Sequence, residues 1–209
     1  MCSSDLLSNL DARLRDNLRV QLRELQTQLA ITSIYVTHDQ REALALADRI
    51  AVMQSGEVLQ IADPIALYNN PATSTIADFL GYSNVFEVDV ARDANPADGG
   101  TEVVFKAHER RLRAAEPGPS QAAELCVCVR PDHVAIRAQD AGDGTAPVAP
   151  NRIDGEVILA SFLGSHMQYR VRAGEHEVWE VLSPQVGAGI RLGARVQLSI
   201  EPRHLQVLA

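Results

Sequence analysis

One histidine follows a short apolar run in a way that suits recognition of a phosphate group. Residues 31–36 are mainly β-branched and apolar, and Thr37, His38 and Asp39 come directly after them. A neutral imidazole at the end of a buried strand can donate its ring proton to a phosphate oxygen, in a charge-assisted bond of about 1.5–3 kcal/mol. The bond is lost when the phosphate leaves, so His38 would report which nucleotide is present. The alternative is that His38 caps the next helix or lies at its start.

A second polar cluster comes earlier in the chain. Ser8, Asn9, Leu10 and Asp11 stand directly before a helix striped with leucines. Asp and Asn cap helices well, because their side-chain oxygens accept hydrogen bonds from the free amides of the first turn. Taken alone, Asp11 is therefore an N-cap candidate.

The ordered set of motifs resembles the ATP-binding subunits of ABC transporters, in particular importers of sugars, polyamines and iron. Ser8–Asp11 resembles the D-loop, and residues 36–43 resemble the loop that carries the switch histidine. Further matching segments follow in order at 47–53, 55–57, 62–64, 67–68, 70–73, 77–81 and 84–86. The resemblance implies that His38 contacts the γ-phosphate of ATP and that Asp11 reaches across a dimer interface.

The residues that hold and activate ATP in that family have no counterpart in the sequence. A P-loop needs a glycine-rich turn ending in Lys-Ser/Thr, whereas the single lysine, Lys106, has no glycine loop before it. The Leu-Ser-Gly-Gly-Gln signature is also absent. Asp5 stands where the family has its catalytic Glu, as a possible degenerate version one methylene shorter. We therefore expect no catalytic residue and no bound cofactor in this chain alone, with ATP and magnesium only in a complete subunit.

The second part of the chain resembles the TOBE domain of the same subunits, an OB-like β-barrel. The matching segments are 128–134, 155–157, 162–165, 193–196 and 200–202. Arg130 and Asp132 lie in the first of them, and either contact a ligand or regulator, or fix a turn by pairing with each other. The predicted architecture is an α/β fragment of an ABC nucleotide-binding domain at 1–83, followed by an all-β OB-like TOBE barrel at 84–209.

The hydrophobic pattern supplies the elements that position these residues. Helices are predicted at 13–30, 40–47, 64–68 and 74–80, a buried strand at 31–36, and a hairpin at 49–53 and 57–61. The first helix is expected to turn an arginine-rich face outward, and Arg41 and Glu42 are expected to be solvated. Strands are predicted at 85–90, 101–106, 125–129, 132–137, 155–160, 167–172, 176–182 and 195–200.

Composition excludes several functional classes. The formal net charge is −8, spread over both parts of the chain, so binding to nucleic acid is not expected. No apolar run reaches the roughly 20 residues of a membrane span. Cys126 and Cys128 alternate with apolar residues and lack a second pair at zinc-site spacing, so free thiols on a strand are favoured over a metal site. These features indicate a reducing compartment, most simply the cytoplasm.

Three functions follow as hypotheses. The first is part of an importer's ATP-binding subunit, a homodimer that works peripherally at the inner face of the membrane with permease subunits. The second is a stand-alone TOBE module that binds a small oxyanion, and the third is a dimerisation module without a ligand. For the first hypothesis, the predicted strand 31–36 would expose open edges unless it docks on the barrel, on a second copy or on the missing part of the domain.

Overall fold

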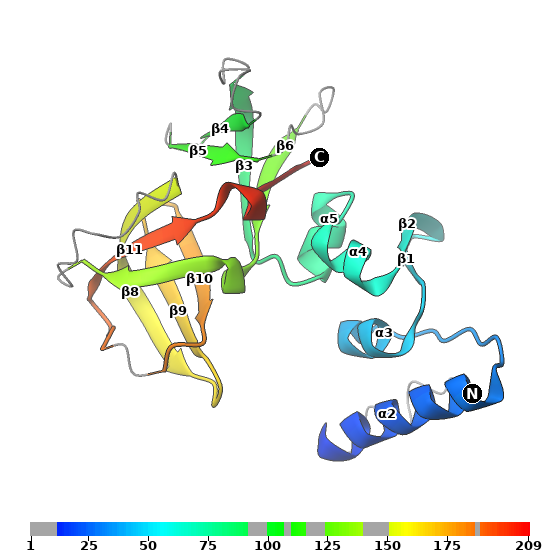
Figure 1. The fold of residues 1–209 in the computed structure, drawn as a ribbon. Coiled ribbons are helices and arrows are strands. Elements are labelled where there is room, and N and C mark those ends of the chain that lie inside the picture. Colours follow the sequence, from blue (N-terminus) through cyan, green and yellow to red (C-terminus); the bar gives the residue numbers. More distant parts are fainter. Residues whose placement is uncertain (1–11, 92–99, 107–109, 116–123, 140–150, 187–188) are drawn as a thin grey trace. The chain divides into compact units, whose positions relative to one another are not determined.

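The structure is a computed structural model that describes residues 12–91, 100–106, 110–115, 124–139, 151–186 and 189–209 (Figure 1). The chain divides into two compact units, residues 1–72 and 73–209. This division falls before the predicted boundary at residue 83 because helix α5 (Ser74–Phe79) packs against strand β6 (Leu125–Val129) of the second unit. The division of the family's two domains at residue 83 stays a prediction.

The first unit contains three helices and one hairpin within its described part. They are α2 (Ala12–Leu29), α3 (Gln40–Leu46), β1 (Ile50–Gln54), β2 (Glu57–Ala62) and α4 (Pro64–Asn69). The predicted helices and the hairpin are confirmed. Ser55 and Gly56 both have positive φ, 52° and 86°, and this conformation joins two antiparallel strands by a tight turn. Asp63 caps α4, whose first residue is Pro64, as the fixed φ of proline favours.

The predicted buried strand at 31–36 is wrong. These residues form no regular element and pair with no strand among the described residues. Ile34 is 94% exposed and Val36 is 81% exposed. The sequence has the composition of a strand, but a strand needs a hydrogen-bonding neighbour and a cover on each apolar face. The described part of the first unit supplies neither to this segment.

Helix α2 also exposes a different face from the one predicted. Two of its arginines face α3: the side chains of Arg19 and Arg23 both donate hydrogen bonds to residues of the α3 region. Three leucines of its stripe are exposed instead, with Leu22 at 37%, Leu25 at 50% and Leu29 at 56%. The prediction of an arginine-rich outer face is therefore wrong. The guanidinium groups of Arg19 and Arg23 face inward because they donate to the carboxylates of Asp39 and Glu42 and to the Leu46 carbonyl.

The second unit is built from two antiparallel sheets of five strands each, after helix α5. One sheet has the order β12–β6–β3–β4–β5 and the other β10–β9–β8–β11–β7. The first consists of β12 (Gln206–Leu208), β6 (Leu125–Val129), β3 (Asn84–Ala91), β4 (Thr101–Phe105) and β5 (Arg111–Ala114). The second consists of β10 (Val178–Ser183), β9 (Met167–Arg172), β8 (Asn151–Phe162), β11 (Arg195–Ile200) and β7 (Val134–Ala138). The predicted strands are confirmed in kind, and β5 and β12 were missed because they are four and three residues long.

Two short 3₁₀ turns carry the chain from one sheet to the other. The turn η2 (Pro131–His133) leads from β6 to β7, and η3 (Pro202–His204) leads from β11 to β12. Each turn follows the pattern Pro-x-His, and the rings of His133 and His204 stack with centroids 4.0 Å apart. The two crossings therefore meet at one point, where both sheets are tied together.

A single apolar core lies between the two sheets. Phe105 and Trp179 of this core form an aromatic cluster with the partly buried Phe86, whose ring centroid is 4.5 Å from that of Trp179 and 5.2 Å from that of Phe105. Two buried asparagines satisfy backbone groups at its edge. The amide of Asn84 bonds both backbone groups of Glu180, and that of Asn151 bonds both of Arg113. Such paired bonds hold irregular strand contacts in register, since each buried polar group finds a partner.

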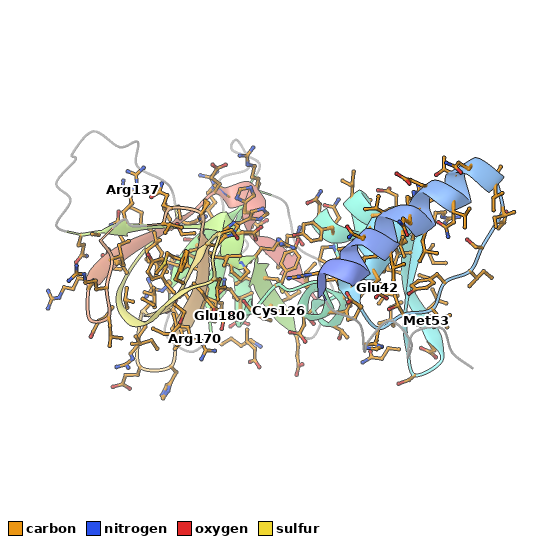
Figure 2. All side chains as sticks on the ribbon, turned by 90° about the horizontal axis from the view of Figure 1, so that it is seen from below. Glu42, Met53, Cys126, Arg137, Arg170 and Glu180 are labelled. Carbon is orange, nitrogen blue, oxygen red and sulfur yellow. The ribbon has the colours of Figure 1, made fainter. Side chains whose placement is uncertain are left out.

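Polar side chains lie on the outer faces of the sheets, as Figure 2 shows for Arg170 and Glu180. They come from neighbouring strands β9 and β10 and form an ion pair of 2.9 Å. Cys126 and Cys128 are free and buried on β6, which confirms the prediction of strand-borne thiols. None of the described helices is long and apolar enough to cross a membrane.

Candidate functional site

His38 lies on an exposed bend between the 31–36 segment and helix α3. It does not cap the helix. Asp39 is the N-cap residue, and its carboxylate accepts hydrogen bonds from the amides of Arg41 (2.8 Å) and Glu42 (3.3 Å). His38 is therefore one residue before the N-cap, and its ring does not cap the helix.

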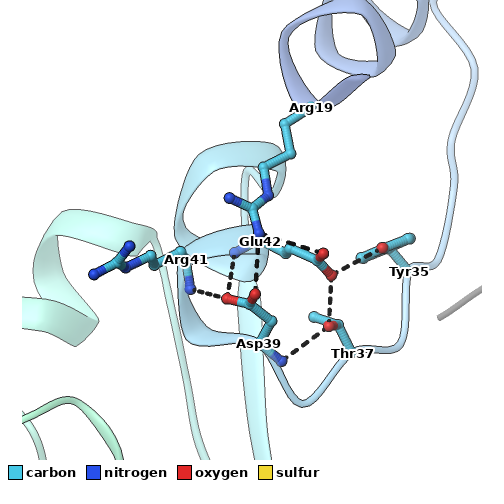
Figure 3. Close-up of polar contacts among 6 residues, drawn as sticks. All are labelled: Arg19, Tyr35, Thr37, Asp39, Arg41 and Glu42. Atoms are coloured by element: carbon cyan, nitrogen blue, oxygen red, sulfur yellow. Dashed lines mark hydrogen bonds and ion pairs between the residues drawn. The ribbon is translucent and has the colours of Figure 1, made fainter. Parts of the chain in front are cut away.

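Glu42 is the centre of a buried polar network beside this bend (Figure 3). Its side chain is on the first turn of α3 and only 5% of the residue is exposed. One carboxylate oxygen accepts hydrogen bonds from the Thr37 hydroxyl (2.8 Å) and the Tyr35 hydroxyl (3.0 Å). The other oxygen lies 3.4 Å from a guanidinium nitrogen of Arg19 on α2. Both oxygens of this buried carboxylate therefore have polar partners from the protein in place of water.

Arg19 joins this network to the helix cap. The same guanidinium nitrogen that approaches Glu42 also donates to the Asp39 carboxylate at 3.0 Å. One cation thus neutralises part of the charge of two carboxylates. Burial, together with the hydrogen bond to Glu42, raises the pKa of the Tyr35 hydroxyl, which keeps it a donor at neutral pH.

The network fixes the backbone on both sides of His38. Thr37 donates to Glu42, and the Asp39 amide donates to the Thr37 hydroxyl at 3.0 Å. Asp39 in turn caps α3. The two neighbours of His38 are held while its own side chain remains exposed, so the imidazole is accessible from solvent on a fixed stretch of backbone.

The prediction that Glu42 is solvated is wrong, whereas the exposure of Arg41 is confirmed. Glu42 follows Thr37 by five residues, so a helix that starts at Gln40 folds its first turn back over the preceding loop. Hydrogen-bonding residues placed just before an N-cap and an acid in the first turn are the sequence signal that could have found this contact.

The D-loop candidates Ser8, Asn9, Leu10 and Asp11, and the degenerate position Asp5, lie outside the described residues. Their assignments to the D-loop and to a degenerate catalytic position therefore stay predictions. The parts of the chain that the structure describes contain no group of three or more His, Cys, Asp or Glu side chains arranged for a metal ion.

Arg130 and Asp132 lie at the start of the η2 turn and form an ion pair of 3.0 Å. Arg130 is 9% exposed, and its guanidinium also donates to the Leu80 carbonyl (3.4 Å) and lies over the Tyr82 ring, 5.6 Å from the centroid. These contacts match the interpretation in which the pair fixes a turn. A ligand or regulatory role for the two residues stays a prediction.

Comparison with known proteins places these features in a family. Residues 127–208 match the family model of the TOBE domain. Over 97% of its length the chain is 38% identical to an Fe(3+) ions import ATP-binding protein of Brucella melitensis and 41% identical to one of Rhizobium etli. It is 37% identical over 97% of its length to a spermidine/putrescine import ATP-binding protein of Rubrobacter xylanophilus.

The second unit therefore contains a TOBE domain with an OB-like β fold. The curated relatives that it matches are ATP-binding subunits of ABC importers, and the chain spans about half of their length, 53%, 53% and 52% respectively. Among solved structures, the cytoplasmic molybdate-binding protein ModG matches 60% of this chain and 94% of its own, with 13% identity and a TM-score of 0.47.

Proposed function

We propose that this chain forms one part of the ATP-binding subunit of an ABC importer and does not hydrolyse ATP alone. In this proposal residues 1–83 are part of the nucleotide-binding domain, with His38 as the γ-phosphate switch and Ser8–Asp11 as the D-loop. The TOBE barrel regulates or dimerises the subunit. ATP and magnesium bind only in the completed subunit, which works as a homodimer with permease subunits at the inner, cytoplasmic face of the membrane.

The observation that carries the proposal is the exposed apolar surface of the first unit. Leu22, Leu25 and Leu29 on α2 are exposed, as are Ile34 and Val36 in the following segment. Burying one such side chain contributes about 1.5–3 kcal/mol, so leaving a set of them in water forfeits a large stabilisation. The segment 31–36 has the composition of a buried strand, and the relatives have about twice the length of this chain. A further polypeptide that carries the phosphate-binding residues would supply both the sheet and the cover.

The geometry beside His38 supports the switch role. Thr37 and Asp39 are tied to α3 through Glu42 and the helix cap, while the His38 side chain is exposed. A γ-phosphate oxygen that accepts its ring proton would form a charge-assisted bond of about 1.5–3 kcal/mol. Because the histidine is positioned before the nucleotide arrives, most of that free energy is available for sensing.

A fusion protein tests the proposal. The half of the Brucella melitensis relative that this chain does not match is joined ahead of residue 1, and ATP hydrolysis is measured for the fusion and for the chain alone. We expect hydrolysis by the fusion and none by the chain. In the fusion, His38→Ala should lower the rate about 10- to 100-fold, since that is the rate equivalent of one lost charge-assisted hydrogen bond. Arg41→Ala, at an exposed neighbouring position, is the matched control and should keep the rate. Hydrolysis by the chain alone contradicts the proposal.

A further inference from the structure

Two turns of the second unit meet at a stacked pair of histidines. Each turn and its N-cap have a similar sequence, Arg-Pro-Asp-His at η2 and Glu-Pro-Arg-His at η3. The rings of His133 and His204 lie 4.0 Å apart between centroids and 18° from parallel. The strands that follow the turns, β7 and β12, each lie at the edge of a sheet. The stack therefore joins the points at which the chain enters these two edge strands.

The same two crossings hold the opposite ends of helix α5. At its carboxyl end, the Arg130 guanidinium, beside η2, donates to the carbonyl of the C-cap residue Leu80 at 3.4 Å. At its amino end, the amide and the hydroxyl of Ser74 donate to the carbonyl oxygen of Ala209, directly after β12, at 3.1 and 3.3 Å. A helix of six residues is not stable by itself, so the position of α5 depends on these anchors and on its packing against β6.

The stack suits neutral rings. The Nδ1 atom of His204 is buried and has no hydrogen-bond partner among the described residues. A protonated imidazole carries an N–H on both ring nitrogens, so a protonated His204 would have a buried donor without an acceptor. Two charged rings 4.0 Å apart would also repel each other. Protonation therefore opposes the stacked arrangement.

The charged groups around the stack modify this preference. Burial has the largest effect on the pKa of both histidines and lowers it, and the charge of His204 lowers the pKa of His133 further. The other influential charges belong to the turns and their N-caps, and of these the arginines lower and the acids raise the pKa values. They are Arg130, Asp132, Glu201 and Arg203. The strands packed against the turns, β10 and β5, carry three more charged residues, Glu180, Arg111 and Arg113.

We propose that the stacked pair of His133 and His204 is a proton-sensitive switch that controls the anchoring of helix α5. While both rings are neutral, the stack joins η2 to η3 and keeps β7 and β12 in place. A proton on either ring favours a locally open state in which that ring reaches water, because water accepts from the new N–H and screens the charge. Opening of the two crossings separates Ala209 from Ser74 and loosens the bond from Arg130 to Leu80. Helix α5 then loses the contacts at both of its ends, while the remaining strands stay folded.

The switch links the barrel to the part of the chain that precedes it. Helix α5 is the first element of the second unit and directly follows the first unit in the sequence. A change in its anchoring would therefore be transmitted to the first unit, which makes the regulatory role of the barrel dependent on pH. This last step rests on the proposed function, whereas the switch itself is a property of the second unit.

Native-state hydrogen exchange of the full chain, followed in low concentrations of urea, tests the switch. Because the pKa values are lowered in the folded state, the stack is closed above about pH 6.5 and opens as the pH falls. An opening that takes up one proton is favoured about tenfold by each pH unit below that value. We expect the amides of α5 and β12 to lose about tenfold in protection between about pH 7.5 and about pH 5.5, after correction for the intrinsic exchange rate. Their exchange at the lower pH should depend little on urea, since local opening exposes little surface, whereas exchange in β8 and β9 should increase steeply with urea.

Two results would overturn the proposal. One is unchanged protection of α5 and β12 at the lower pH. The other is the same urea dependence in α5, β12, β8 and β9, which would mean that acid only promotes unfolding of the whole unit. Neither measurement involves ATP, so failure of the switch and failure of the proposed function are distinguishable.

Variants assign the effect to the stack. His133→Phe/His204→Phe retains two aromatic rings that cannot be protonated, so the pH-dependent change in α5 and β12 should disappear. His176→Gln, at an exposed histidine, is the control and should keep the change. If the phenylalanine pair prevents folding, His204→Gln alone should reduce the change, because one of the two titrating rings is removed. An unaltered change in either variant would contradict the assignment.

Discussion

The Thr37 hydroxyl donates a 2.8 Å hydrogen bond to the buried carboxylate of Glu42, and this bond ties the residue before His38 to helix α3. The same carboxylate accepts from Tyr35 and approaches Arg19. Under the proposed function His38 would contact phosphate, and the bond from Thr37 to Glu42 would hold the residue next to it before the phosphate arrives.

Replacement of Glu42 should therefore loosen the whole region around the bend. Glu42→Ala leaves Tyr35, Thr37 and Arg19 without their shared acceptor, and we expect a loss of about 1–3 kcal/mol in the local free energy of opening. Hydrogen exchange of the amides in α3 measures this loss. Arg41→Ala, at the exposed neighbouring position, is the control. Unchanged exchange in Glu42→Ala would contradict the structural role of the network.

Polar substitutions on the exposed apolar surface should have opposite effects in two forms of the protein. In the chain alone, Leu25→Lys and Ile34→Lys change side chains that are 50% and 94% exposed, so stability should change little and self-association should decrease. In the fusion with the missing half, each should destabilise the first unit by about 1.5–3 kcal/mol, because the site is then covered. Light scattering and chemical denaturation measure the two effects. A similarly small effect in both forms would mean that this surface stays uncovered.

Truncation of the core aromatic cluster should be severe. Phe105 is 2% exposed and packs against Phe86 and Trp179, so Phe105→Ala should lower the free energy of unfolding by about 3–5 kcal/mol. Denaturation followed by the fluorescence of Trp179, the single tryptophan, reports on the barrel itself. Phe162→Ala is the matched control, since Phe162 is 60% exposed and should cost little. Equal costs for the two variants would place the core elsewhere.

Acid should destabilise the second unit through the stacked histidines. Burial lowers the pKa of both His133 and His204. The pKa of His133 is lowered further by the charges of His204, Arg130 and Arg203, whereas the carboxylate of Asp132 raises it. For His204, Glu201 and Asp132 oppose the shift and Arg203 reinforces it. The buried Nδ1 of His204 has no hydrogen-bond partner among the described residues, which also disfavours a charged ring.

The direction of the pH dependence follows from the lowered pKa values. Below a pH of about 6.5 these histidines bind protons in the unfolded chain but remain neutral in the folded chain. Their contribution to the free energy of unfolding should therefore be complete above that pH and decrease as the pH falls toward the folded pKa values. Denaturation midpoints between about pH 8 and pH 5 measure the slope. The double variant His133→Gln/His204→Gln should have a flatter profile, and an identical slope in the variant would contradict this assignment.

The sequence predicted local elements well where one segment contains the whole signal. Helix α3, the Ser55–Gly56 turn and strands β6, β9 and β11 follow from residue types at short range. The predictions that were wrong concern segments whose structure depends on residues distant in the sequence. Residues 31–36 need neighbouring strands to form a strand, and the direction in which α2 turns depends on the carboxylates of Asp39 and Glu42. Periodicity alone cannot supply either.

The candidate site was predicted in part. His38 was selected from its place after an apolar run, and its role stays a prediction. Glu42 was missed because an acid in the first turn of a helix is usually solvated. The pairing of Arg130 with Asp132 was foreseen as one of two interpretations, and the structure shows the pair. The stacking of His133 on His204 could not be found, since it joins two turns far apart in the sequence.

The most direct test of the central claim is ATP hydrolysis by the purified chain, measured alone and after fusion to the half of its relative that it does not match. The account predicts no hydrolysis by the chain, hydrolysis by the fusion, and a rate about 10- to 100-fold lower in the fusion with His38→Ala. Hydrolysis by the chain alone, or a fusion that is active and indifferent to His38→Ala, would contradict it.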